Sequence, residues 1–194
     1  MFDVDEFVSD CRAAGAEGEP RRAVREVLAR AVARPGEVGD ALRPSEAGLT
    51  VLHTGPDLTV VHVVWAPGMR VDPHDHRMWA AIGIYSGRED NSFYRRAPAD
   101  GDGRVLTESG GKRLAVGDVV LLGDDAIHAV HNPETRLTGA IHVYGGDFVN
   151  DPRSQWTPDL CEERPYGMEA TRRHFAEANR AWLGDGGGVD GDAP

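Results

Sequence analysis

The chain has 194 residues, 40% of them hydrophobic, with 24 glycines and 12 prolines, which fits one domain with appendages rather than two full domains. Its 21 Lys and Arg against 32 Asp and Glu give a formal net charge of −11, which is unfavourable for binding nucleic-acid phosphates. No apolar run approaches the roughly 20 residues of a membrane span, and Met1–Asp10 carries acidic residues where a signal peptide needs basic ones. These features predict a soluble, cytoplasmic protein without nucleic-acid or membrane partners.

Helical periodicity characterises the first 35 residues. Asp3 can cap a helix over Val4–Ala14, and Pro20 suits the first position of a second helix. Hydrophobic residues then recur at three- and four-residue spacing until Pro35-Gly36 ends the pattern. Residues 1–48 are therefore predicted to be a helical segment packed on the domain that follows.

From about Leu49 to Phe148 the periodicity changes to two, which is typical of β-strands. The clearest strand candidates are β-branched runs, at Leu58–Trp65, Trp79–Tyr85, Val119–Leu122 and Thr138–Tyr144. Turn-forming residues separate the runs, including those at Pro98–Gly103 and Ser109-Gly110-Gly111. Many short strands without intervening helices predict a mainly β fold, a sandwich or small barrel, over residues 49–156.

The last part of the sequence changes character again. Residues Asn150–Tyr166 are irregular, and Met168–Leu183 has a helical pattern, so residues 157–183 are predicted to be a C-terminal extension with a helix. The tail Gly184–Pro194 is rich in glycine and aspartate and is predicted to be disordered.

The chemical signal of the sequence is its histidines, above all His74-Asp75-His76 and His128. Alternate side chains of an extended segment share a face, so His74 and His76 project together while Asp75 points away. Two imidazoles on one face can hold one metal ion, and a third from a neighbouring strand would leave positions open for substrate and oxygen. His131 competes with His128 for that third place, and an isolated His-x-His pair can also be two surface histidines without a metal.

The surroundings of these histidines resemble the two sequence motifs of the cupin superfamily. Gly68, His74, His76 and Gly87 match the spacing of the first motif, and Gly117, Gly123, His128 and Asn132 match the spacing of the second. Cupins commonly place a glutamate four residues after the second histidine, where this chain has Ala80. A three-histidine site is therefore expected, and three neutral ligands would leave the positive charge of a divalent metal to attract a thiolate or a carboxylate.

Within the cupins, the sequence is similar to the cysteine dioxygenase-like branch, the thiol dioxygenases, and to small bacterial enzymes described as predicted metal-dependent double-stranded β-helix proteins. The similarity rests on four segments, at Pro73–His76, Gly83–Asn91, Ile127-His128 with Asn132, and Ala140–Phe148. It implies a jelly-roll-like double-stranded β-helix with one Fe(II) per chain, held by His74, His76 and His128. The implied reaction is the oxidation of a small thiol, such as cysteine or 3-mercaptopropionate, to a sulfinate with O2.

The same resemblance implies catalytic roles for His142 and Tyr144, which match the last two members of a Ser-His-Tyr relay. The serine position is Ala140, and Thr138 is the expected partial substitute. Tyr144 would hydrogen-bond the substrate or oxygen, and His142 would orient its hydroxyl group.

Two departures from the resemblance bear on the substrate. Ala81 stands where mammalian cysteine dioxygenase has a cysteine, so no Cys-Tyr cross-link can form, and Gly48–His53 lacks the arginine that fixes the substrate carboxylate there. The substrate-binding residues are therefore left unassigned, with four arginines as candidates for a carboxylate partner, Arg77, Arg95, Arg96 and Arg153.

Three other functions are compatible with the same residues. They are a three-histidine dioxygenase with a non-thiol substrate, a biosynthetic variant that oxidises and rearranges cysteine, and a non-enzymatic cupin that binds a metal or a ligand. Imidazole ligands also suit Ni, Mn, Zn and Cu. The oligomeric state is not predicted, and His62 is expected to be a core or surface histidine rather than a donor beside the metal.

Overall fold

The computed structural model describes residues 1–97 and 105–184, so the predicted turn at Pro98–Gly103 and residues 185–194 of the predicted tail lie outside the described residues. The elements are four helices and eleven strands, in chain order α1 (Val4–Gly15), α2 (Pro20–Val32), α3 (Pro35–Leu42), β1 (Gly48–Thr54), β2 (Thr59–Trp65), β3 (Arg70–Asp75), β4 (Ala80–Ser86), β5 (Arg88–Arg96), β6 (Leu106–Ala115), β7 (Val119–Leu122), β8 (Ile127–His131), β9 (Thr138–Tyr144), β10 (Ser154–Trp156), β11 (Glu163–Pro165) and α4 (Met168–Gly184) within the described part of the chain.

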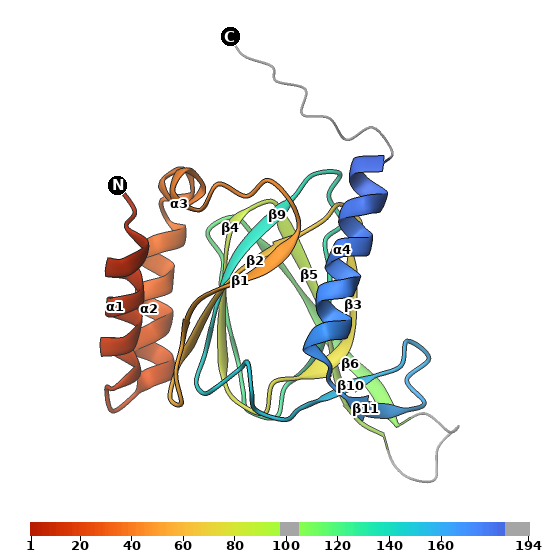
Figure 1. Ribbon diagram of the computed structural model, residues 1–194. Helices are drawn as coiled ribbons and strands as arrows, with labels where there is room; N and C mark the ends of the chain where they lie inside the picture. Colours follow the sequence, from red (N-terminus) through yellow and green to blue (C-terminus); the bar gives the residue numbers. More distant parts are fainter. Residues whose placement is uncertain (98–104, 185–194) are drawn as a thin grey trace.

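The strands form two antiparallel sheets, with orders β1-β2-β9-β4-β7 and β11-β10-β3-β8-β5-β6. The eight strands from β2 to β9 pair in a nested way, β2 with β9, β3 with β8, β4 with β7 and β5 with β6. Successive nested pairs lie in opposite sheets, which is the arrangement of a jelly roll. The fold is the predicted double-stranded β-helix, with helices at the N-terminal and C-terminal ends (Figure 1).

The helices α1 and α2 cover the outer face of the five-stranded sheet (Figure 1). Strand β9, in the middle of this sheet, shows how the sequence separates two cores, because every one of its residues is buried. Ile141 and Val143 pack with the helices in one hydrophobic cluster, whereas Ala140 and Tyr144 belong to the cluster between the sheets. The strand is thus buried on both faces, and its inward residues line the interior of the barrel.

Close packing of α2 on this sheet depends on Gly83 of β4. A Cβ atom at Gly83 would lie 2.8 Å from Leu28 Cγ and 3.0 Å from Val32 Cγ1. We expect Gly83→Ala to lower the free energy of unfolding by about 1–3 kcal/mol, because the helix must shift to admit the methyl group. Gly48→Ala, where nothing lies within 4 Å of the added Cβ, is the control and should change it by no more than about 0.5 kcal/mol in urea unfolding. Equal effects of the two substitutions would contradict this account.

Two local predictions were wrong, and the short helix α3 was not predicted. Pro35-Gly36 does end the periodic pattern of α2, but Pro35 also begins α3, because proline is well suited to a first helical position. The segment Asn150–Tyr166 contains the short strands β10 and β11 rather than only irregular chain. The predicted turn at Ser109-Gly110-Gly111 lies inside β6, where Gly110 has φ +148° beside an irregularity in the pairing with β5.

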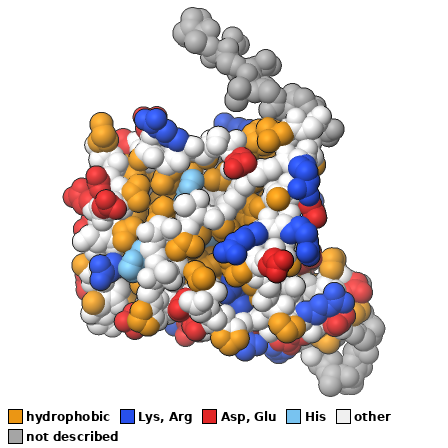
Figure 2. Space-filling model, viewed as in Figure 1, with side chains coloured by type: hydrophobic (Ala, Val, Ile, Leu, Met, Phe, Trp, Pro, Cys, Tyr) orange, Lys and Arg blue, Asp and Glu red, His pale blue; other side chains and the backbone are white. Residues whose placement is uncertain are grey.

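Helix α4 lies across the barrel on the side away from α1 and α2 (Figure 1). Phe175 is its one fully buried side chain within the described residues, and its ring stacks on Trp65 at a centroid distance of 5.4 Å. The side chain of Asn179 also forms two hydrogen bonds with the backbone of Ala47, at 2.7 and 2.8 Å. On the face shown in Figure 2, Lys and Arg side chains lie along the α4 side, next to hydrophobic side chains in the middle. No described helix is both long and apolar enough to cross a membrane.

Candidate metal centre

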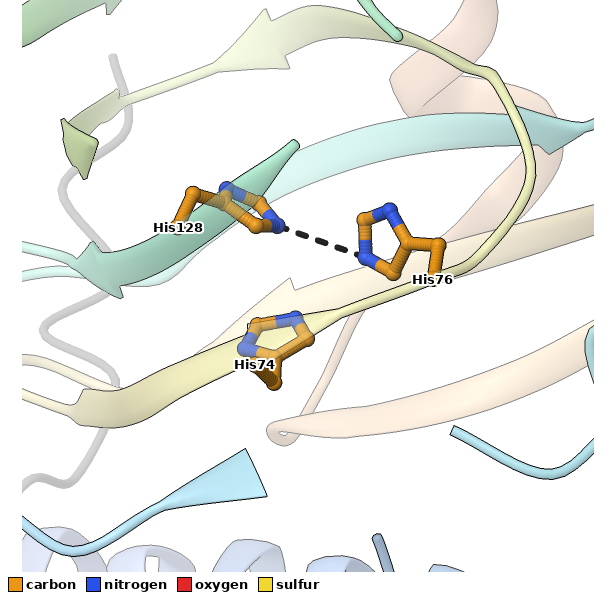
Figure 3. Close-up of side chains that lie close together, drawn as sticks. All are labelled: His74, His76 and His128. Carbon is orange, nitrogen blue, oxygen red and sulfur yellow. Dashed lines mark hydrogen bonds between the residues drawn. The ribbon is translucent and has the colours of Figure 1, made fainter. Parts of the chain in front are cut away.

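Three histidine side chains converge inside the barrel, His74 and His76 from β3 and the residue after its end, and His128 from β8 (Figure 3). His74 and His128 are direct partners in the antiparallel ladder between these strands. The alternation of side chains then places His76 on the same face as His74. Each residue offers a ring nitrogen, and the three nitrogens lie within 4.8 Å of one another, so this group could hold a metal ion.

Hydrogen bonds fix the proton on two of the three rings. His74 Nδ1 lies 3.0 Å from the carbonyl oxygen of Asp72, which can only accept, so His74 donates from Nδ1 and keeps the lone pair of Nε2 free. His128 Nδ1 lies 2.7 Å from Asn91 Oδ1, and the same reasoning leaves His128 Nε2 free. That free nitrogen lies 3.3 Å from His76 Nε2, the contact drawn in Figure 3.

The donor set fits a divalent metal. Two imidazole nitrogens directed at each other over 3.3 Å can share the N–H proton of one neutral ring, as a hydrogen bond, or a metal ion in its place. Metal–imidazole bonds of about 2.0–2.1 Å place two ligand nitrogens about 2.8–3.4 Å apart at octahedral or tetrahedral angles. Burial lowers the pKa of His74 to about 4 and holds the pKa values of His76 and His128 well below their usual range, so all three rings are neutral at pH 7.

His142 and Tyr144 extend this group along β9. The tyrosine hydroxyl lies 2.9 Å from His142 Nδ1, and its ring centroid lies 4.9 Å from that of His76. Both side chains are buried. The expected role of Thr138 was wrong, because its hydroxyl is engaged elsewhere, with the backbone of Arg88 and with Asn132 Oδ1 at 3.0 Å.

A small enclosed cavity of about 20 Å³ adjoins the three histidines. Its remaining walls are apolar and aromatic side chains together with His142 and Thr171, namely Leu49, Val63, Trp65, Val71, Val130, Tyr144, Phe148, Tyr166 and Phe175. Thr171 and Phe175 belong to α4, so the helix supplies one wall and the barrel supplies the others. Among the described residues, no Asp, Glu, Lys or Arg lines this cavity.

Two residues behind the histidines were missed by the sequence analysis. Asn91 and Glu89 lie two apart on β5 and are buried, and the amide of Asn91 joins the Glu89 carboxylate to His128. The available signal was an acidic and an amide side chain two residues apart in Gly83–Asn91, one of the segments that carry the resemblance. Its meaning depends on β5 pairing with β8, which the sequence does not show.

The other histidines lie apart from the centre. His62 faces the helix side of its sheet, where its Nε2 lies 2.7 Å from the hydroxyl of Tyr85, in keeping with the expected core histidine. His131 is opposite Arg70 and Asp90 in the neighbouring strands, and the group that could hold a metal ion contains His128 rather than His131. His174 contacts the carbonyl oxygen of Arg70 from α4.

The buried His62 makes stability depend on pH. Burial lowers its pKa to about 4, so between about pH 6.5 and 4 the unfolded chain binds a proton that the folded chain does not. The stabilising effect of neutral His62 is therefore lost as the pH falls through this window. We expect the difference in unfolding free energy between wild type and His62→Gln to shrink by about 2 kcal/mol from pH 7.5 to 5.0. His53→Gln, on β1, is the control. In urea titrations, its unfolding free energy should differ from that of wild type by the same amount at both pH values.

Of the four candidate arginines, Arg153 is the one that is buried. Its guanidinium lies over the rings of Phe148 and Tyr166, at 4.0 and 4.1 Å from their centroids, and both rings line the cavity. Arg77 and Arg96 reach Glu163, and Arg95 is exposed. Arg153 therefore places a positive charge behind the aromatic wall of the cavity without lining it.

The fold and the histidine group define a double-stranded β-helix protein with a candidate metal centre. No protein-family model matches the chain. Among solved structures, it is similar to a cupin family protein from Methanocaldococcus jannaschii at 11% identity, covering 54% of this chain and 84% of that one, with a TM-score of 0.43. A cupin superfamily protein from Desulfitobacterium hafniense matches at 14% identity over 54% of this chain and 82% of that one, with a TM-score of 0.42.

A third similar structure is the DMSP lyase DddQ from Ruegeria pomeroyi, at 18% identity and a TM-score of 0.44. The match covers 59% of this chain and 53% of the lyase, so this chain spans about half the length of that protein. These likenesses concern the fold of the barrel. The cysteine dioxygenase-like branch within the cupins stays a prediction.

Proposed function

We propose that this protein is a mononuclear iron dioxygenase that oxidises a small thiol to a sulfinate. The observation that carries the proposal is the Tyr144 hydroxyl, held by His142 at 2.9 Å beside three neutral, convergent histidines. A neutral ligand set suits an anionic substrate such as a thiolate, and a buried hydroxyl in a chamber with mainly apolar and aromatic walls suits the transfer of oxygen to it.

His74, His76 and His128 would hold the metal. Bound Fe(II) would supply open positions at which a thiolate and O2 can meet. In the overall reaction, RS⁻ and O2 give RSO2⁻. The O–O bond breaks, both oxygen atoms form bonds to sulfur, and the four electrons that sulfur loses reduce the O2.

The chain's own residues would bind and orient the substrate and exclude water from it. Burial raises the pKa of Tyr144, so its hydroxyl keeps its proton at pH 7, and with that proton directed at His142 the oxygen presents a lone pair toward the cavity. His142 Nδ1 lies within hydrogen-bond distance of the same oxygen and fixes its direction. The aromatic and aliphatic walls exclude water from the reacting sulfur.

The cavity also favours one kind of thiol. Because no acidic side chain lines it within the described residues, an ammonium group on the substrate would find no partner there. The positive charge of Arg153 behind Phe148 and Tyr166 favours a carboxylate. We therefore propose a short thiol that carries a carboxylate but no ammonium group, so that 3-mercaptopropionate ranks above cysteine.

The test is a thiol panel with protein loaded anaerobically with Fe(II). Oxygen uptake and the mass of the product are measured for 3-mercaptopropionate, cysteine, cysteamine and 1-propanethiol. The proposal expects one O2 consumed per sulfinate formed, with 3-mercaptopropionate as the best substrate. No oxygen uptake with any thiol would overturn it, and so would cleavage of the thiol without consumption of oxygen.

A further inference from the structure

Glu89 is a fully buried carboxylate beside the metal centre. Its Oε1 accepts a hydrogen bond from Asn91 Nδ2 at 2.8 Å, and its Oε2 accepts one from Trp65 Nε1 at 2.8 Å. Within the described residues, the one basic side chain within 4.0 Å is His142. Burial alone would raise the pKa of this carboxyl, but its contacts with His142, Asn91 and Trp65 outweigh burial and lower it. The group is therefore a buried negative charge without a Lys or Arg partner.

One oxygen of this carboxylate acts on a candidate metal ligand. An ionised carboxylate only accepts hydrogen bonds, so Asn91 must turn its NH2 group toward Glu89 and its carbonyl oxygen toward His128. That carbonyl oxygen can only accept, so His128 must carry its proton on Nδ1. The negative charge of Glu89 thus selects, through Asn91, the ring tautomer whose Nε2 is free to bind a metal.

The other oxygen faces the candidate catalytic pair. Glu89 Oε2 lies 3.8 Å from His142 Nε2, which is longer than a hydrogen bond and within the range of an ion pair. His142 Nδ1, on the opposite side of the ring, contacts the Tyr144 hydroxyl. A negative charge next to Nε2 favours a proton on that nitrogen, which makes Nδ1 the acceptor of the tyrosine proton.

We propose that Glu89 is a positioning residue that serves both halves of the centre at once, fixing the His128 tautomer through Asn91 and orienting Tyr144 through His142. Glu89 approaches His142 on the side away from Tyr144, where Thr138 was expected to replace the serine of the relay in part. The inference rests on the metal site of the proposed function, but not on the thiol or on O2.

The first test needs no substitution. Long-range 15N–1H NMR spectra of the full-length, metal-free wild type at pH 7.5 distinguish the two neutral tautomers of each histidine. The expected result is a proton on Nδ1 of His128. A proton on Nε2 of His128 would overturn the proposal, whatever the substrate of the protein.

The second test compares Glu89→Gln with Asp90→Asn. Asp90 is the next residue on β5, and it projects to the other face, where it accepts from Arg88 at 2.8 Å, so both substitutions remove one negative charge from the same strand. Co(II) affinity is measured by competition with a chelator. We expect about 10–100-fold weaker binding for Glu89→Gln, a mixture of His128 tautomers, and recovery of most of the affinity in Glu89→Asp. Asp90→Asn should stay within about threefold of wild type because its charge is screened by solvent.

Equal losses in the two variants, or unchanged affinity and tautomer in Glu89→Gln, would overturn the proposal. If Glu89→Gln does not fold, Asn91→Ser decides, because it breaks the link to His128 while leaving the carboxylate in place. A mixed His128 tautomer in that variant supports the network, and an unchanged tautomer contradicts it. Neither readout uses thiol oxidation, so a failed thiol panel and a failed network give different results.

Discussion

Replacement of His128 by alanine is expected to abolish binding of one Fe(II) or Co(II) per chain and to lower oxygen uptake on the order of 1,000-fold. The reason is geometric, because His128 is the ligand from the opposite strand, and without it only His74 and His76 remain on β3 and the residue after it. Metal content by mass spectrometry and initial rates of oxygen uptake measure the two effects.

The matched control is His131→Ala. His131 is three residues further along the same strand, so its side chain projects to the other face, opposite Arg70 and Asp90. This variant should keep its metal and its rate. Loss of metal from His131→Ala with retention in His128→Ala would show that His131, and not His128, is the third ligand.

Replacement of Tyr144 by phenylalanine is expected to leave metal binding intact and to lower turnover by about 100- to 10,000-fold. The substitution removes only a hydroxyl group, whose contact with His142 at 2.9 Å positions it toward the cavity. The ring remains and keeps its stacking on Phe148. Turnover numbers from oxygen uptake, together with the absorption spectrum of the Co(II)-loaded protein, separate an effect on chemistry from an effect on the metal.

Tyr85→Phe is the control for this substitution. Tyr85 is also buried and its hydroxyl also contacts a histidine, His62, at 2.7 Å, but on the helix side of the same sheet. Its loss should reduce stability and leave turnover unchanged. Similar turnover in Tyr144→Phe and wild type would remove the tyrosine from the mechanism.

The sequence was sufficient for features that depend on local pattern. The change of period at Leu49 predicted where the barrel begins, and alternation alone placed His74 and His76 on one face. The motif spacing pointed to His128, which the structure places directly opposite His74 in the ladder. The spacing from Gly117 to Asn132 along the sequence therefore pointed to a residue that meets His74 across two paired strands, β3 and β8.

What the sequence could not provide is the register between distant strands. Asn91 and His128 are 37 residues apart, and their hydrogen bond follows from the pairing of β5 with β8. Likewise, the amphipathic pattern of α4 predicts a helix but not the surface that it covers. Only its packing beside Trp65 makes Thr171 and Phe175 part of the cavity.

Because α4 forms one wall of the cavity, the candidate metal centre and the shape of the cavity are encoded in different parts of the sequence. The candidate metal ligands and the His142–Tyr144 pair lie on strands of the barrel or, for His76, directly after one, and β9 is held between two hydrophobic cores. The size and polarity of the chamber depend also on Thr171 and Phe175, on a helix encoded after the barrel is complete. Substitutions in α4 can thus alter which molecule fits the cavity while the candidate metal ligands stay the same, so under the proposed function the substrate range could evolve independently of the metal chemistry.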